Sequence, residues 1–122
     1  MIGTGRPRRG VLIEDSLAPP KRDGHVAVYD AANNRMIIFG GESNTPSGFP
    51  DRNDVWILAN ANGLSGISTW STLTPSGTPP DRRAYALGAY DSTNNRLIVD
   101  EGGSPDGAFF STWVLTGANG LP

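Results

Sequence analysis

The chain has 122 residues, which is enough for one domain with a modest core but not for separate cofactor and substrate domains. Its 16 glycines and 10 prolines, beside only 37% hydrophobic residues, disfavour long helices and favour many short strands. The near balance of 10 basic and 12 acidic residues gives no net field that would favour nucleic acid, and the lack of cysteine excludes disulfides, thiolate metal sites and cysteine nucleophiles.

Residues 1–18 are predicted to form an N-terminal arm. Arg6, Arg8 and Arg9 make a small basic cluster in it, which could contact an anion but is more simply a solvated tail. Residues 10–17 are a candidate outer strand. No run approaches the roughly 18 apolar residues of a membrane span, and no apolar stretch of signal-peptide type follows the basic cluster. We therefore expect no membrane span and no signal peptide in this chain, while the lack of thiols leaves the compartment open.

Residues 19–78 have the pattern of four short strands separated by turns. The first expected strand carries β-branched and aromatic residues, and turn formers follow it. The second is a continuous apolar run that is too short for a helix and ends at paired glycines. We predict a four-stranded antiparallel meander with strands at 25–29, 36–39, 54–58 and 69–73.

Residues 79–122 repeat this pattern. The segment from Tyr29 to Ile38 returns as Tyr90 to Val99, and Trp56 returns as Trp113. The pair Gly40-Gly41 is matched to Gly102-Gly103, with single-residue insertions between the copies. The second copy lacks the outer fourth strand, and the segment 10–17 is positioned to take its place. We therefore predict eight strands, permuted by one, of which the second copy supplies those near 85–90, 96–99 and 112–115.

The repeated residues form a specific combination: Arg22-x-x-His25, Asn34-Arg35 before an apolar strand, Gly40-Gly41 after it, Asp54-Val55-Trp56 in the third strand and Trp70 in the fourth. This combination resembles the kelch repeat of β-propellers, particularly its longer bacterial form, over about residues 19–121. The resemblance implies an all-β fold of four-stranded antiparallel kelch-type propeller blades, two per chain. It also implies architectural roles for Gly40, Gly41, Trp56, Trp70, Gly102, Gly103 and Trp113.

The second copy departs from the kelch pattern at two places. Ala86 stands where the first copy has His25, and the charged pair Asp100-Glu101 precedes the glycines where the first copy has Phe39. Charge is therefore expected beside a strand end that the pattern makes apolar.

Two blades cannot close a propeller, which typically has four to eight. An uncovered blade leaves an apolar face in water, at about 25 cal/mol per Å² of apolar surface. We expect other blades to cover these faces, either from a longer parent chain or from further copies of this chain in a homo-oligomeric ring or a filament. A strand at 10–17 could complete the last blade of a neighbouring copy.

Residues near the expected propeller channel offer little chemistry. The resemblance places His25 there, and Arg22, Arg83 and Tyr85 are the other channel-lining candidates. A single imidazole without carboxylates at metal-ligand spacing is more simply structural. Arg22 and Arg83, or else Arg82, are expected to tie strands together by charge-assisted hydrogen bonds.

Catalytic patterns are also weak. The acidic pairs Glu14-Asp15 and Asp100-Glu101 place adjacent side chains on opposite sides of an extended segment, so neither suits shared acid and base work. Galactose oxidase, an enzyme with the kelch fold, needs a Cys-Tyr crosslink and two histidines, which this chain cannot supply. We therefore expect no metal, no cofactor and no catalysis. A propeller enzyme acting on a sugar, with a site built from several chains, stays the less favoured alternative.

Loops outside the repeat pattern are the better recognition candidates. The loop after the first paired glycines carries Glu42 and Phe49, and its counterpart carries Asp106, Phe109 and Phe110. Exposed loop aromatics suit binding, although burial under the loops or at a subunit contact fits them equally well.

The favoured function is a non-catalytic kelch-type propeller unit that serves as a protein- or carbohydrate-binding scaffold. The alternative is a self-assembling structural protein that forms a ring or filament through its exposed blade faces. The bacterial long-form resemblance slightly favours an extracellular or cell-surface location.

Overall fold

The computed structural model describes residues 8, 10–13, 17–43, 45–46, 48, 50–64 and 66–122. The described residues form an all-β, antiparallel structure without a helix, as predicted. None of them belongs to a helix that is long and apolar enough to cross a membrane. The strands are β1 (Val26–Asp30), β2 (Arg35–Glu42), β3 (Asp51–Ala59), β4 (Thr69–Leu73), β5 (Leu87–Asp91), β6 (Arg96–Asp100), β7 (Gly103–Ser104), β8 (Gly107–Ala108) and β9 (Thr112–Thr116).

The first sheet has the strand order β1-β2-β3-β4, so each strand pairs with its neighbour in sequence. Ile37 is paired with Val28 on one side and with Ile57 on the other. The β1–β2 turn ends at Asn34, whose φ of 53° is a conformation that asparagine tolerates better than most residues. A bulge between Phe39 and Gly41 shifts the β2–β3 register, and pairing then continues beyond it.

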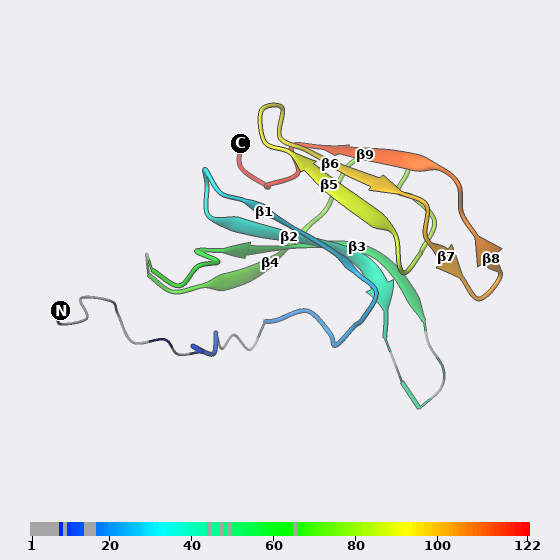
Figure 1. Cartoon of the computed structure of the whole chain (residues 1–122), viewed down its shortest axis with the longest axis horizontal. Coiled ribbons are helices and arrows are strands. Elements are labelled where there is room, and N and C mark those ends of the chain that lie inside the picture. Colours follow the sequence, from blue (N-terminus) through cyan, green and yellow to red (C-terminus); the bar gives the residue numbers. More distant parts are fainter. Residues whose placement is uncertain are drawn as a thin grey trace, which may run out of the picture.

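The second sheet has the order β5-β6-β9, and the two-residue strands β7 and β8 form a separate small hairpin (Figure 1). The connection from β6 to β9 passes through this hairpin, at the end of the sheet where β6 stops. Among the described residues no strand pairs with the free side of β9, whereas its counterpart β3 is covered by β4.

The two sheets pack against each other, with β1 alongside β5 (Figure 1). One side of the junction is very tight: a Cβ built on Gly88 would lie 2.2 Å from Cγ1 of Val26, so only glycine fits there. The buried core takes residues from both sheets: Val26, Ile37, Phe39, Val55 and Ile57 from the first, with Leu97, Val99 and Ala118 from the second and the turn that follows it.

The two repeats match at the level of single hydrogen bonds. In the first, the Tyr29 hydroxyl donates to Oδ1 of Asn34, whose Nδ2 donates to Oδ1 of Asn62. In the second, Tyr90, Asn95 and Asn119 form the same chain of bonds. The repeat seen in the sequence is therefore also a repeat of local structure.

The described part of the segment 10–17, residues 10–13 and 17, forms no strand within this chain, and Val11 and Leu12 are exposed there. Its pairing with the last blade of a neighbouring copy stays a prediction. One detail of the sequence prediction is wrong, because the two glycine pairs are misaligned. Gly41 and Gly102 share a φ of 94°, so Gly40 corresponds to Glu101, with φ values of 67° and 62°, and no insertion separates the copies at this point.

Strand ends differ modestly from the prediction. β2 and β3 are longer than expected because Gly41 and Glu42 pair with Arg52 and Asp51 beyond the bulge. The described residues form three open sheets, of four, three and two strands, and no closed one. The division of the chain into segments 1–18, 19–78 and 79–122, and the propeller itself, stay predictions.

Candidate functional site

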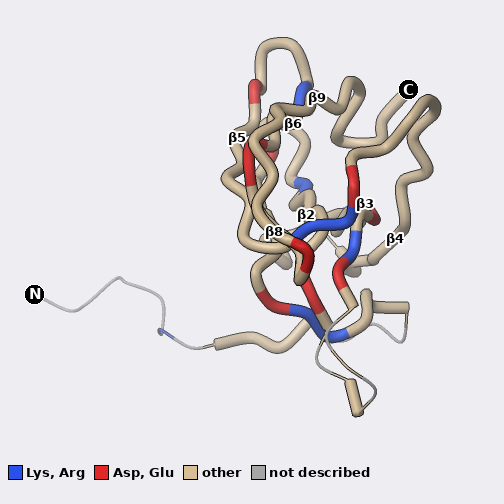
Figure 2. The backbone as a smooth tube through the Cα atoms, turned by 90° about the vertical axis from the view of Figure 1, so that its right-hand side faces the viewer, with Lys and Arg blue, Asp and Glu red and all other residues tan. Residues whose placement is uncertain are grey.

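A pocket of about 700 Å³ lies at the end of the molecule where β2 ends and β3 begins, beside the β7–β8 hairpin. In Figure 2, acidic segments lie next to β8 and below it, with basic segments between them. The pocket is lined by Glu42, Asp51, Ala84, Tyr85, Glu101, Gly102, Gly103, Ser104, Pro105, Ala108, Phe109 and Phe110. A second cavity, of about 240 Å³, lies under the connection between the sheets and is lined mainly by apolar side chains.

Glycine kinks position the walls of this pocket. Gly41 has a φ of 94°, and a Cβ there would lie 2.7 Å from the carbonyl oxygen of Asp23. This close approach allows Asp23 and Glu42 to exchange two main-chain hydrogen bonds of 2.9 and 2.8 Å. In the second repeat, Ala84 and Gly103 make the same exchange. Both loops therefore leave their sheets on the side of the pocket.

Asp51 is the most unusual group in the pocket. Its exposed fraction is 8%, and neither carboxylate oxygen has a hydrogen-bond partner among the described residues. Burial raises the pKa of Asp51, and the neighbouring negative charges of Glu42 and Asp106 raise it further. A buried acceptor that is left unpaired costs free energy. A ligand that uncovers the two Asp51 oxygens, which have almost no accessible surface, and donates to them would recover this cost.

Aromatic side chains also line the pocket. Tyr85 is 64% exposed, and its hydroxyl donates to Oε1 of Glu42 at 3.2 Å and lies 3.4 Å from Oδ2 of Asp23. The hydrogen bond to Glu42, together with the charges of both acids, raises the pKa of the phenol. Phe110 is 84% exposed. The guanidinium carbon of Arg83 lies over the ring of Phe109, 4.5 Å from its centroid. The pocket thus joins negative charge to apolar faces.

The structure brings together most of the predicted binding-loop residues. Glu42, Phe109 and Phe110 line the pocket, and Asp106 is close enough to influence the charge state of Asp51. Phe49 lies outside the described residues. The local sequence does not distinguish Asp51, because an aspartate at the start of a strand becomes notable only when burial leaves it unpaired.

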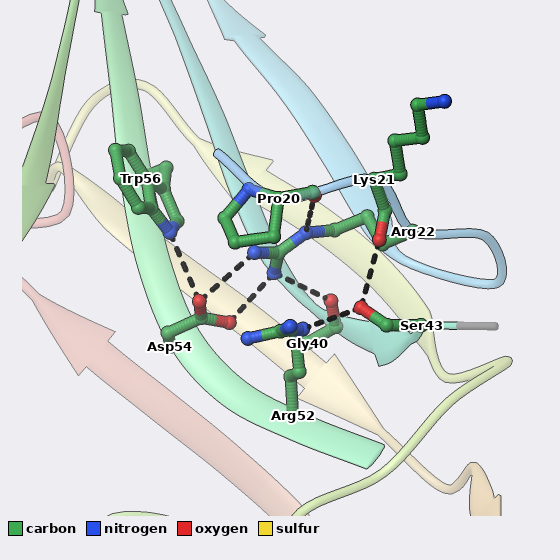
Figure 3. A network of polar contacts seen from close by, with 8 residues as sticks. All are labelled: Pro20, Lys21, Arg22, Gly40, Ser43, Arg52, Asp54 and Trp56. Carbon is green, nitrogen blue, oxygen red and sulfur yellow. Dashed lines mark hydrogen bonds and ion pairs between the residues drawn. The ribbon is translucent and has the colours of Figure 1, made fainter. Parts of the chain in front are cut away.

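Arg22, one of the channel-lining candidates, is instead buried within the first sheet (Figure 3). Its guanidinium donates to both carboxylate oxygens of Asp54, at 2.6 and 2.9 Å, and to the carbonyl oxygen of Gly40. Trp56 donates to the same carboxylate through Nε1. Burial alone raises the pKa of Asp54, but the hydrogen bonds from Arg22 and Trp56 outweigh this and hold the pKa below its ordinary value.

Arg83 occupies the same place in the second repeat, with 1% exposure. It donates to the carbonyl oxygen of Glu101 at 2.9 Å and to the hydroxyl of Ser111, which also accepts from Nε1 of Trp113. Ser111 thus stands where the first sheet has Asp54. The predicted tying of strands by arginine is confirmed for Arg22, which joins β2 to β3. Arg83 joins the residue after β6 to the residue before β9. Within the described ranges, Arg82 makes no such link.

The other two channel candidates are exposed. His25 packs its Cβ close to Gly41, and Tyr85 belongs to the pocket wall. Of the acidic pairs, Asp100 accepts a hydrogen bond from Thr112, while Glu14 and Asp15 lie outside the described residues. The part of the chain that the structure describes brings no three histidine, aspartate or glutamate side chains together in a group that could hold a metal ion.

No family model matches the chain. A segment is similar to dynein regulatory complex subunit 7 of Chlamydomonas reinhardtii, with 32% identity over 74 residues. The similarity covers 59% of this chain and 6% of that protein, so the chain matches only a small part of the relative's length. This similarity does not establish a family for the chain.

Proposed function

We propose that the chain is a non-catalytic, kelch-type binding unit whose pocket receives a basic side chain, lysine or arginine, from a protein partner. The resemblance of the repeats supports the scaffold role. The observation that carries the choice of ligand is Asp51, a buried carboxylate without a partner in the wall of an open, aromatic-lined pocket.

Charge and shape favour a cationic ligand over a neutral one. The negative charges of Glu42 and Asp106 act on Asp51, and none of the described residues that line the pocket is basic. The exposed rings of Tyr85 and Phe110 can offer their faces to a cation or to the alkyl part of its side chain. A volume of about 700 Å³ leaves room for one long side chain and part of the segment that carries it.

The test is a titration with short peptides that differ at a single central residue: lysine, arginine or the uncharged norleucine. Binding is followed by chemical-shift changes of the chain. We expect the lysine and arginine peptides to bind and the norleucine peptide to bind at least about tenfold more weakly, since one lost ion pair of about 1.4 kcal/mol gives that factor. Asp51→Asn and Phe110→Ala should each weaken binding, and Asp81→Asn, an exposed acid outside the pocket, should not.

The stability of Asp51→Asn separates lost binding from lost folding. Because the pKa of Asp51 is raised in the folded state, the folded chain binds more protons than the unfolded chain above the ordinary pKa of 3.8. The free energy of unfolding contributed by this group therefore falls as pH rises, and the variant should be at least as stable as the wild type at neutral pH. Ligand affinity should change in the opposite direction and increase with pH as Asp51 ionises.

Two results would reject this function. One is equal binding of the lysine and norleucine peptides. The other is saturable binding of a neutral oligosaccharide that depends on Phe110 but not on Asp51, which would point to a carbohydrate ligand instead.

A further inference from the structure

The junction between the two sheets is a head-to-tail contact in which each sheet contributes a different face. At one end, Nδ2 of Asn119 donates to Oδ2 of Asp30 at 2.9 Å, and Nη1 of Arg35 donates to the carbonyl oxygen of Asn119 at 2.9 Å. Asp30 is only 2% exposed, so this contact is fully enclosed. In Figure 1 the turn after β9 accordingly lies beside the β1–β2 turn.

Main-chain hydrogen bonds hold the other end of the junction. The amide of Arg83 donates to the carbonyl oxygen of Arg52, and the carbonyl oxygen of Arg83 accepts from the amide of Gly41. The amide of Tyr85 donates to the carbonyl oxygen of Gly24 at 2.6 Å. These bonds fix the position of one sheet on the other independently of side-chain identity.

Because the sheets are repeats, each half of this junction occurs a second time on the outside of the molecule. Asp91 and Arg96 on the second sheet correspond to Asp30 and Arg35, and Asn62 on the first sheet corresponds to Asn119. Among the described residues, Nδ2 of Asn62 and the guanidinium of Arg96 donate no hydrogen bond. The same holds for the main-chain amides of Arg22 and Gly102, which correspond to those of Arg83 and Gly41.

Apolar residues that are buried in the junction likewise have exposed counterparts on the outer face. Val26 and Ile57 are 5% and 2% exposed because the second sheet covers them. Their counterparts on the outer face of the second sheet, Leu87 and Val114, are 65% and 49% exposed. The outer face of the second sheet is thus an uncovered copy of the face that the first sheet buries.

We propose that a second copy of this chain docks its first sheet on the outer face of the second sheet, repeating the junction within the chain. In this arrangement, Asn62 of one copy donates to Asp91 of the other, and Arg96 of the other donates to the carbonyl oxygen of Asn62. The contact is heterologous, since each copy uses a different face, and it leaves one face free at each end for a further copy.

The experiment measures mass in solution by sedimentation and light scattering between about 1 μM and about 1 mM, the range of moderate affinities. Two variants each remove one face. Asn62→Asp keeps acceptors for Asn34 and for the amide of Leu64 but sets a carboxylate against Asp91. Leu87→Asp puts a charge in the apolar face at an exposed position. Neither residue lines the pocket, so the peptide titration remains a separate measurement.

We expect the mass of the wild type to rise with concentration, and each single variant to stay at the monomer mass of 12.9 kDa with an unchanged circular dichroism spectrum. An equimolar mixture of the two variants should form a heterodimer and stop there, because each retains the one face that the other lacks. A symmetric contact between like faces would not be restored by mixing.

Three results would overturn the proposal: a wild type that stays monomeric throughout the range, single variants that associate as the wild type does, or a mixture that remains monomeric. A monomeric wild type would indicate that further repeats of a longer chain, and not a second copy, cover these faces. Loss of peptide binding with unchanged association would reject the pocket function alone.

Discussion

Two equivalent arginines are buried in different ways, and the difference predicts how each affects stability. Arg22 has the carboxylate of Asp54 as a bidentate partner, whereas Arg83 has only carbonyl and hydroxyl acceptors and the ring of Phe109 among the described residues. A buried guanidinium paired with a carboxylate is better compensated than one bonded to neutral acceptors.

Asp54→Ser should therefore destabilise the chain at neutral pH, because it leaves Arg22 buried without a charge partner. We expect a loss of about 2 kcal/mol, below the range for fully buried pairs, because the Asp54 side chain is one-third exposed. The pKa of Asp54 is lowered in the folded state, so its contribution is complete above the ordinary value of 3.8 and is lost as pH falls through the folded pKa. Urea unfolding of variant and wild type should thus give converging free energies below about pH 4.

Ser111→Asp is the matched change in the second repeat, and it should raise the free energy of unfolding at neutral pH by giving Arg83 a carboxylate. If Asp54→Ser and Ser111→Asp both lowered the free energy of unfolding, this account would be contradicted, because the second site would then be adapted to serine.

Strand identity is the part of the fold that local sequence determines best. Turn formers at 30–34 and 91–95 and the apolar runs after them predict two hairpins, and β1–β2 and β5–β6 lie there. The match between Gly40 and Glu101 could not be found in the same way, because letter identity aligns glycine with glycine. Only the backbone shows that Glu101 adopts the left-handed conformation of Gly40.

The pocket depends on contacts that are distant in sequence. Loop composition was enough to select Glu42, Phe109 and Phe110, since aromatic and acidic residues outside a repeat stand out. Asp51 was not found because nothing local distinguishes a paired carboxylate from an unpaired one. Burial raises its pKa most, and Glu42 and Asp106, which belong to different repeats, raise that pKa further.

The contact between β1 and β5 gives a prediction for a pair of elements. Gly88→Ala should lower the free energy of unfolding by about 1–3 kcal/mol, because the new Cβ would lie 2.2 Å from Val26 and the two strands would have to separate. Val26→Ala in the same chain removes the clashing Cγ1 and should recover part of this loss. Additive effects of the two substitutions in a double-mutant cycle would show that the strands do not meet here.

For the whole molecule, the question is whether two small sheets unfold as one unit. Their core is shared, and Asp30 of the first sheet is enclosed by Asn119 of the second. Burial raises the pKa of Asp30, but hydrogen bonds from Asn119 and Asn33 more than compensate and lower it overall. This charged contact across the junction ties the stability of one sheet to the presence of the other.

Asn119→Ala and Asn62→Ala test this coupling as a matched pair. Both remove the same bonds to the preceding asparagine of their repeat, but only Asn119 also donates across the junction. At concentrations too low for association, Asn119→Ala should therefore cost about 1–3 kcal/mol more than Asn62→Ala, since it leaves a buried carboxylate short of a donor. Equal losses in urea unfolding, or separate transitions for the two sheets in the wild type, would mean that the junction does not couple them. At concentrations where copies associate, the difference between the two losses of stability should become smaller. Asn62 then also has a partner across a junction of the same kind, so its removal costs more.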